Sequence, residues 1–372
     1  MRKPIQLAVI IALLAALLTG CRDRHNLEDL TVILMLGIDV DGNNNLVFYE
    51  SSPVFNKEAK DKEEEYGVKV ATFHEAREVF DAMVTALTVE GKVQIILLSH
   101  RLLKRGDWFP LFDTFYRDTK NSLSPKVVAV DGPVSDIIHF TPKDKPLLPM
   151  FITSLIEQNH RRNITVSTNL LDLHRQMTDR GMTPFISEIK KNKEVELTGT
   201  TLLQKDGKYA DSLNLQQTTL LRILQQHRRG EQTVTLSIPA GQKKGPIEQN
   251  KLSFLIQHLS NKTKTAYEQG RFRFDTQVNM TVTLTERLFP YNMRTESRKL
   301  EQMMEKELQK QLQNLIKKMQ KHKADPVGYG DLARAYQYQA WSKFGQQWGE
   351  AWSKAEVNVS VKVKIKSSGP IL

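Results

Sequence analysis

The chain has 372 residues, of which 40% are hydrophobic and 26% are charged, and its formal net charge is +11. This balance is typical of a globular protein and excludes a largely disordered chain. A basic chain suggests an acidic partner, such as anionic lipid or wall polymer, or a charged surface that only keeps the protein soluble. Nucleic acid is not expected as a partner, because no recognition motif accompanies the charge.

The first twenty residues have the anatomy of an export signal. Two cations precede an apolar run at 5–18 that is too short to span a bilayer as a helix. Residues 18–21, Leu-Thr-Gly-Cys, then resemble a bacterial lipobox, and Cys21 is the only cysteine of the chain. The sequence therefore predicts a lipoprotein signal peptide at 1–20, cleavage before Cys21, and lipid on that cysteine. Such a protein is anchored on the extracytoplasmic face of a membrane. The alternative is an uncleaved signal anchor.

After the signal peptide, residues 21–190 are expected to form an α/β domain. Amphipathic helices alternate there with short strands, and the strand at 93–98 is apolar except for Gln94, which predicts burial on both faces. Turn residues at 41–45 predict a hairpin, and the charged segment 57–65 is expected to be a loop. The predicted strands span 31–40, 46–52, 93–98 and 127–130, and the predicted helices span 73–87, 108–116, 147–158 and 168–180.

Two further domains of the α+β class are expected, a middle one at 191–245 and a C-terminal one at 246–372. The middle domain follows a polar break near residue 190 and ends in a linker rich in glycine and lysine. The C-terminal domain is expected to be an antiparallel sheet crossed by one long helix, because alternating strands flank a long helical pattern. The predicted strands span 194–204, 233–238, 252–259, 271–286 and 357–365, and the predicted helices span 215–226, 296–323 and 329–344.

The long helix carries leucine, isoleucine and methionine along one face. A face that contains methionine suits a partner groove as well as a core. The spacing is ordinary helical amphipathicity, which favours core.

No set of reactive residues predicts an enzyme site. The sequence has no phosphate-binding loop, nucleophile elbow or zinc-ligand spacing, so we expect no catalytic residue, no cofactor and no metal. His160 and His227 each lie beside two arginines and are expected at the surface. Asp39 begins a pattern similar to a calcium-binding loop, but Asn44 occupies the position that needs glycine. We therefore expect a hairpin turn there and not a metal site.

Several segments, in order, resemble the Ger(x)C family of spore germination lipoproteins. Residues 20–24 and 27–30, followed by 36–39 (Leu-Gly-Ile-Asp), resemble the start of the family. Arg22 stands where the family usually has Trp, and Asn26 where it usually has Glu. Further similar segments are 93–99 followed by 102–103, then 116–118, 197–207 with the helix through 220–221, 318–328, and the terminal strand that ends at 366–369.

The resemblance implies a lipid-anchored C subunit of a GerA-type nutrient germinant receptor, with three α/β or α+β domains. Its implied partners are the integral membrane A and B subunits in the inner membrane of a dormant spore, with a response to small nutrients. It carries no catalytic residues over to this chain. The alternative is a lipid-anchored extracytoplasmic solute-binding protein of a transporter, for which two similar α/β lobes around a cleft are expected.

Overall fold

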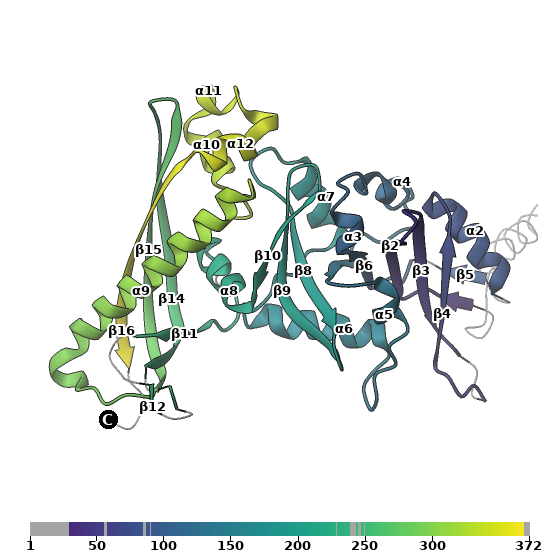
Figure 1. Cartoon of the computed structure of the whole chain (residues 1–372), viewed down its shortest axis with the longest axis horizontal. Coiled ribbons are helices and arrows are strands. Elements are labelled where there is room, and N and C mark those ends of the chain that lie inside the picture. Colours follow the sequence, from purple (N-terminus) through teal and green to yellow (C-terminus); the bar gives the residue numbers. More distant parts are fainter. Residues whose placement is uncertain are drawn as a thin grey trace, which may run out of the picture.

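The computed structural model describes residues 30–55, 58–84, 87–89, 91–227, 229–238, 243–244, 247–248 and 250–367. The molecule is elongated, with an eight-stranded sheet toward one end and a four-stranded sheet at the other (Figure 1). The predicted signal peptide, the lipobox and Cys21 lie outside the described residues.

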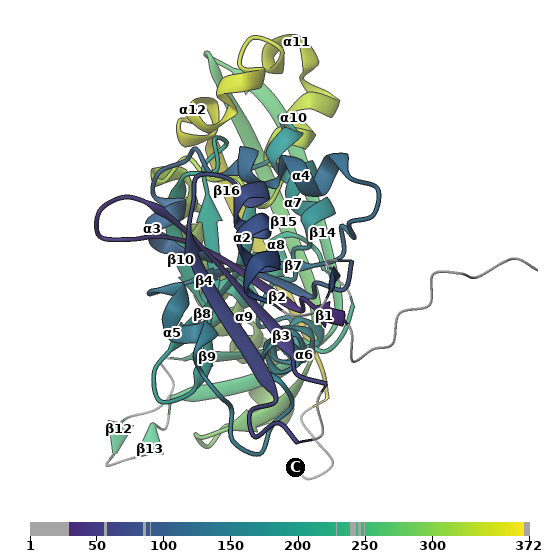
Figure 2. The same ribbon diagram turned by 90° about the vertical axis from the view of Figure 1, so that its right-hand side faces the viewer.

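Four parallel strands form the centre of the eight-stranded sheet, and an antiparallel hairpin extends it on each side. The strand order is β10-β9-β8-β7-β6-β2-β3-β4. Figure 2 looks onto the end of the molecule that carries β3 and β4. The parallel strands are β2 (Met35–Val40), β6 (Ile95–Ser99), β7 (Lys126–Val130) and β8 (Phe185–Lys191). The hairpin strands are β3 (Leu46–Pro53), β4 (Glu63–Lys69), β9 (Val195–Leu203) and β10 (Tyr209–Asn214).

Helices cover both faces of this sheet. One apolar cluster joins Ile96 to Phe80 and Leu102, and another joins the neighbouring Ile95 to Ile152 on the opposite face. Every residue of β6 is therefore buried, as its continuous apolar sequence predicted. The first face carries α2 (Phe73–Met83), α3 (His100–Leu103), η2 (Phe109–Phe112), α4 (Asp113–Arg117) and α7 (Leu170–Thr178), and the second carries α5 (Val134–Ile138) and α6 (Leu148–Arg161).

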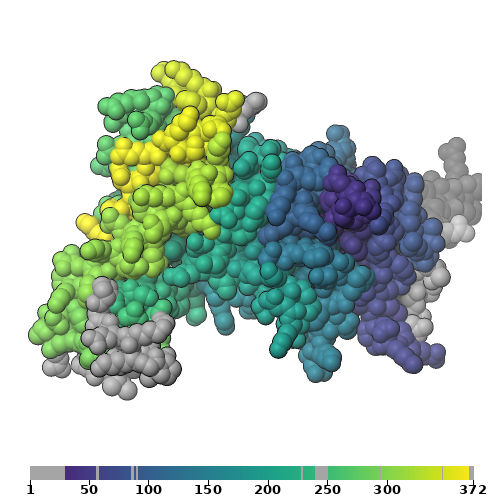
Figure 3. Space-filling model, viewed as in Figure 1, coloured from purple at the N-terminus to yellow at the C-terminus, as the bar shows by residue number. Residues whose placement is uncertain are grey.

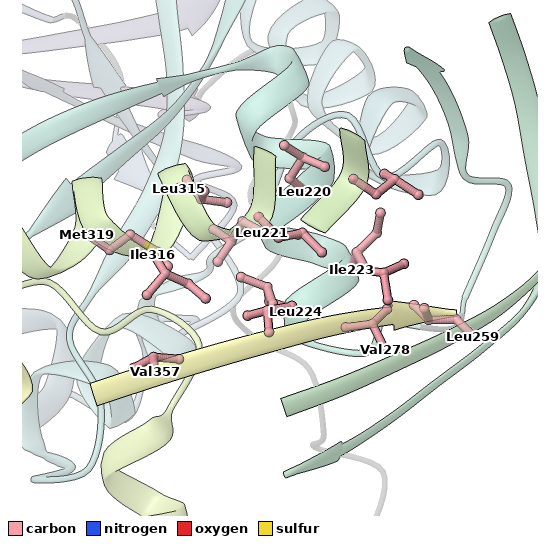
Figure 4. Packing of buried hydrophobic residues seen from close by; sticks show 14 of the residues in the cluster. Leu220, Leu221, Ile223, Leu224, Leu259, Val278, Leu315, Ile316, Met319 and Val357 are labelled. Carbon is pink, nitrogen blue, oxygen red and sulfur yellow. The ribbon is translucent and has the colours of Figure 1, made fainter. Parts of the chain in front are cut away.

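The four-stranded sheet packs one face against the long helix α9 (Met293–Lys321), which lies across it in Figure 1. The predicted apolar face of this helix is core, since Leu308 and Met319 are both 0% exposed. Figure 4 shows that α8 (Leu215–Leu224) adds Leu220 and Leu224 to the same core. The strand order is β11 (Thr233–Ser237), β14 (Lys251–Glu268), β15 (Arg271–Arg287) and β16 (Glu356–Ser367).

Short helices surround the far end of the β14–β15 hairpin, and this end stands out from the rest of the molecule (Figure 3). Trp348 packs edge-on against Phe272, and Trp352 stacks on Tyr329. The helices are α10 (Tyr329–Tyr336), α11 (Tyr338–Trp341), η3 (Gly345–Gln347) and α12 (Trp348–Ser353). Two small ladders pair β1 (Leu30–Val32) with β5 (Leu87–Val89) and β12 (Lys243–Lys244) with β13 (Ile247–Glu248).

The C-terminal sheet is mixed, whereas the sequence predicted an antiparallel one. β11, β14 and β15 pair antiparallel, but β16 runs parallel to β15. The connection explains this direction, because the helices α9 to α12 follow β15 and precede β16 in the chain. A helical crossover between neighbouring strands returns the chain to the end where the first strand began, which makes the pair parallel.

Several strands extend beyond the sequence prediction. β4 occupies part of the segment expected to be a charged loop, because pairing with β3 satisfies its main chain while Glu63 to Glu65 stay partly exposed. β8 and β10 complete the large sheet, so the boundary expected at residue 191 falls on the last residue of β8, which pairs with β9. The division into three domains stays a prediction.

Candidate functional site at the carboxyl edge of the sheet

The carboxyl ends of β2, β6, β7 and β8 share one edge of the sheet, because these strands are parallel. After β6 the chain enters α3 on one face, and after β7 it enters α5 on the other. In α/β proteins, ligands bind in the crevice outside the carboxyl ends of such strands. Six ionisable residues gather there, and we call them the carboxyl-edge cluster: Asp39, His100, Arg101, Asp131, Glu188 and Lys190.

Asp39 fixes the start of α5 against β2. The residue is 1% exposed, and its Oδ2 accepts the main-chain N–H of Val134 at 2.9 Å. The same oxygen pairs with Arg101 at 3.0 Å, and Oδ1 accepts the N–H of Val40 at 2.7 Å. Gly37 faces the same helix, since a Cβ there would stand 2.5 Å from Cγ1 of Val134. Gly37 thus leaves space for α5, and Asp39 binds the first turn of that helix.

His100 lies between two carboxylates at the start of α3. Its Nε2 is 3.3 Å from Glu188, and its Nδ1 is 3.5 Å from Asp131. The imidazole ring also packs on the ring of Tyr209, with 4.7 Å between the centroids. Asp131 in turn pairs with Lys190 at 2.7 Å. One histidine therefore connects the ends of β6, β7, β8 and β10.

Glu188 is a buried carboxylate with several polar neighbours. It accepts hydrogen bonds from Thr198 at 2.8 Å, from Thr201 at 2.7 Å and from Ser212. Burial raises its pKa, but the hydrogen bonds from His100, Ser212 and Thr201 outweigh that effect and lower the pKa to about 2. Glu188 is therefore ionised at neutral pH and holds hydroxyl groups of β9 and β10.

Gly199 allows β10 to approach Glu188. Its φ is +149°, and a Cβ there would stand 1.9 Å from the carbonyl oxygen of Leu213. The strand register shifts opposite this residue, between Glu188 and Ile189. Only glycine fits such a backbone at so close a contact.

The carboxyl-edge cluster provides a charged joint between secondary-structure elements. Each of its three carboxylates pairs with a cation or with hydrogen-bond donors. Within the described part of the chain, no group of three or more His, Cys, Asp or Glu residues could hold a metal ion. The arrangement can therefore fix α3, α5 and β10 against the parallel strands.

A pocket of about 420 Å³ opens near the same edge, between the β2–β3 turn, the end of β4 and the segment after α3. Its two cationic side chains are paired, Lys69 with Asp41 at 2.9 Å and Arg105 with Asp107 at 3.3 Å. Both cations of the pocket are therefore neutralised by these aspartates. The groups that remain for a ligand are side-chain amides and an apolar wall.

A buried carboxylate outside this cluster, that of Asp325, joins the two sheets. Asp325 is 0% exposed and accepts the main-chain N–H groups of residues 328–330 and the indole N–H of Trp348, at 2.9–3.2 Å. Its own main chain exchanges hydrogen bonds with Thr183, just before β8. Burial raises the pKa of Asp325 to about 6 despite these donors. The loop after α9 is thus docked on the large sheet.

His160 and His227 are partly buried, so the prediction that both lie at the surface is wrong. Their ring centroids are 5.3 Å apart, and Nδ1 of His227 lies 2.7 Å from Oδ1 of Asn163. Burial and the charge of Arg222 lower the pKa of both rings, to about 4 for His227. The sequence gives no sign of this contact, because His160 lies in the last turn of α6 whereas His227 follows α8.

The turn predicted at 41–45 is confirmed, since it joins β2 and β3 as a hairpin. Asp41 Oδ1 accepts the N–H groups of Asn43 and Asn45, both at 2.9 Å, so the aspartate stabilises the turn.

Cys21 lies outside the described residues, and lipid on it stays a prediction. β1 begins at Leu30, so eight residues lie between it and Cys21, and the nine Cα–Cα steps from 21 to 30 reach about 30 Å at most. Lipid on Cys21 would therefore keep the β1 end of the molecule near the membrane. Among the described ranges, no helix is long and apolar enough to cross a membrane.

Two family models match the chain in succession. The model described as spore germination protein N-terminal domain matches residues 23–191, and the model described as spore germination B3/GerAC like, C-terminal, matches residues 198–369. The chain belongs to the Ger(x)C family of spore germination proteins. The predicted resemblance is confirmed.

The relatives of this Ger(x)C protein are distant in sequence but similar in length. It is 20% identical to the spore germination protein GerQC of Bacillus cereus, over 97% of this chain and 98% of that protein. It is 23% identical to spore germination protein A3 of Bacillus subtilis (strain 168), over 95% of each chain. The crystal structure of the GerBC protein superposes with a TM-score of 0.57 and 18% identity, and the match covers 89% of this chain and 96% of that one. This likeness confirms the mixed α/β and α+β fold class.

Two of the family-like segments meet at the carboxyl-edge cluster. Residues 36–39 supply Gly37 and Asp39, and residues 197–207 supply Gly199 beside Glu188. His100, Asp131 and Lys190 were not singled out from the sequence. The signal that could have found them is their position at the ends of buried strands, which in a parallel sheet meet at one edge.

Proposed function

We propose that this Ger(x)C protein is a non-enzymatic, lipid-anchored C subunit of a nutrient germinant receptor. In this proposal it acts beside integral membrane A and B subunits at the inner membrane of the spore. The observation that carries the proposal is the succession of two spore germination models over 23–191 and 198–369.

The proposed mechanism is assembly and signal coupling. Lipid on Cys21 confines the protein to two dimensions, which raises its effective concentration near membrane partners. Two acyl chains give stable anchoring where one chain is marginal. The buried joints at Asp39 and Asp325 support a stiff scaffold, because each binds main-chain groups of another element inside the protein.

The structure favours this proposal over a solute-binding protein of a transporter. That class is expected to have two similar α/β lobes around a cleft. This chain has an eight-stranded sheet with helices on both faces and a four-stranded sheet of different strand order with α9 on one face.

Purification of the lipidated protein from spore membranes tests the proposal. We expect the A and B subunits to copurify, and we expect spores that lack the protein to lose germination with the cognate nutrient. Copurification of a transporter, together with unchanged nutrient germination of the deletion strain, would replace the proposal by the transporter alternative.

A further inference from the structure

The C-terminal sheet leaves one strand edge open. β11 pairs with β14 only from Lys251 to Leu255, whereas β14 continues to Glu268. Among the described strands, no other pairs with this side of β14. Figure 1 shows β14 rising well beyond β11 toward the tip of the hairpin. An open edge presents main-chain donors and acceptors to any extended segment that reaches it.

Hydrogen bonds identify which main-chain groups face the open side. Gln337 Nε2 donates to the carbonyl oxygen of Thr265 at 3.2 Å from outside the β14–β15 ladder. Alternate residues of an antiparallel strand direct their N–H and C=O groups to the same side, so Thr263 and Asn261 face the same way. The hydrogen bonds found among the described residues include none to the main chain of these two residues from that side.

A groove of about 560 Å³ runs along this edge, between the end of α8 and the start of α10. Its floor carries the hydroxyl groups of Thr263, Thr276 and Tyr329, which are linked at 3.0 and 3.2 Å. Asn261 lines the groove, and its Oδ1 is buried without a hydrogen-bond partner. The hydroxyl of Thr265, two residues beyond Thr263 along the strand, is also buried and unpartnered.

These orphan polar atoms point to a ligand with hydrogen-bonding groups. A buried donor or acceptor without a partner is unfavourable, so a ligand that supplies the partner is favoured. The side chain of Asn261 is held in place, because its Nδ2 donates to the last carbonyls of α8, those of Ile223 and Leu224. Its Oδ1 therefore stays fixed beside the strand edge.

An exposed tyrosine lies at the rim of the groove. Tyr336 is 67% exposed and lines the groove. Exposed tyrosine is enriched at protein contacts. Lys262 and Lys264 alternate with the threonines and are exposed on the other face of β14. A strand added at this edge would place alternate side chains beside these two lysines.

We propose that the open edge of β14 binds an extended, acidic segment of a partner protein as an additional strand. The main chain of the added strand bonds Asn261 and Thr263, which gives affinity. Acidic side chains on its outer face lie opposite Lys262 and Lys264, and small polar side chains face the hydroxyl floor. The inference goes beyond the proposed function and depends neither on lipid nor on the A and B subunits.

The test uses a fluorescent octapeptide of alternating glutamate and threonine and the full chain in detergent micelles. We expect saturable binding, with slower amide hydrogen exchange at residues 261–265 when the peptide is bound. A lysine–threonine octapeptide serves as the control and should bind at least tenfold more weakly. Equal binding of the two peptides, or unchanged exchange at 261–265, would overturn the proposal.

Two charge-reversal variants distinguish binding of the acidic peptide at the β14 edge from its nonspecific attraction to a basic protein. The double variant Lys262→Glu/Lys264→Glu should weaken binding of the acidic peptide at least tenfold. The matched control is Lys362→Glu/Lys364→Glu, which makes the same change on the exposed residues of β16 in the same sheet. This control should stay within twofold of the parent. Equal weakening by both variants would mean that only net charge is sensed and would refute the site.

Thr263→Pro tests strand addition itself. Proline removes a main-chain donor on the open side, and proline is tolerated at strand edges when its nitrogen faces away from the ladder. Binding should fall at least tenfold while circular dichroism stays unchanged. If this variant fails to fold, Tyr336→Ala provides the second test with the same expected loss. Parent-like binding by a folded Thr263→Pro variant would refute strand addition, and parent-like binding by Tyr336→Ala would refute this groove as the docking site.

Discussion

Replacing Asp39 by alanine should loosen the joint between β2 and α5. The aspartate is 1% exposed and accepts the N–H groups of Val134 and Val40 at 2.9 and 2.7 Å. Alanine leaves both donors buried without an acceptor, at about 1–3 kcal/mol for each. The pair with Arg101 adds about 1 kcal/mol at most, because half of that arginine side chain is exposed. The carboxylate no longer has to be desolvated, so we expect a net loss of about 3 kcal/mol in the free energy of unfolding.

Urea unfolding and amide hydrogen exchange measure this effect. A loss of about 3 kcal/mol makes exchange through opening of the joint roughly a hundredfold faster, since each 1.4 kcal/mol is a factor of ten. The increase should be largest at residues 134–138, which form α5. Asp39→Asn keeps one oxygen for the N–H of Val134 and should cost only about 1 kcal/mol.

Asp107→Ala is the matched control for the same region. Its side chain is 68% exposed and pairs with Arg105 at 3.3 Å, so we expect a change within about 0.5 kcal/mol. The assignment of Asp39 as the acceptor that holds α5 would be refuted by an Asp39→Ala cost no larger than that of the control. It would equally be refuted by unchanged exchange at 134–138.

Four further predictions concern single positions. Glu188 has its pKa lowered from 4.5 to about 2, so its ionised form stabilises the fold above pH 4.5; urea unfolding of Glu188→Gln and the parent should converge as the pH falls toward 2. Asp325 has its pKa raised from 3.8 to about 6, so the parent should lose stability as the pH rises through that range; Asp325→Asn should lack this step in thermal melts. Gly199→Ala should cost about 2–4 kcal/mol in thermal unfolding, because its Cβ meets the carbonyl of Leu213, and a cost below 1 kcal/mol would contradict the bulge geometry. Cys21→Ala should release the protein from the membrane fraction, and complete retention would disprove the anchor.

The elements that the sequence predicts well are those with a strong local pattern. β6 is apolar at four successive positions and is buried throughout, and the leucines and methionines of α9 recur at helical spacing and form core. The turn at 41–45 carries its own signal, because Asp41 caps it through two main-chain bonds. In each case the residues that decide the structure are neighbours in sequence.

The elements that the sequence misses depend on distant partners. β4 begins with three glutamates and is a strand only because β3 lies beside it. The second half of β14 is polar, since one of its faces is exposed and its edge is unpaired, so only 252–259 carries a strand pattern. The direction of β16 depends on a crossover of several helices, and alternation alone does not distinguish a parallel from an antiparallel partner.

The candidate site shows the same division between residues with a local sequence pattern and residues that only the fold brings together. The contacts of its residues indicate the kind of role that the site suits. Gly37 and Gly199 each admit a close contact that a Cβ would prevent, and Asp39 binds a main-chain N–H. These three residues, which lie in family-like segments, fix the positions of α5 and β10. The carboxylate of Asp39 is directed at the backbone of the protein itself, and that of Glu188 at hydroxyl groups of β9 and β10. A fixed shape of this kind suits the proposed role, in which the protein presents surfaces, such as the open edge of β14, to other proteins.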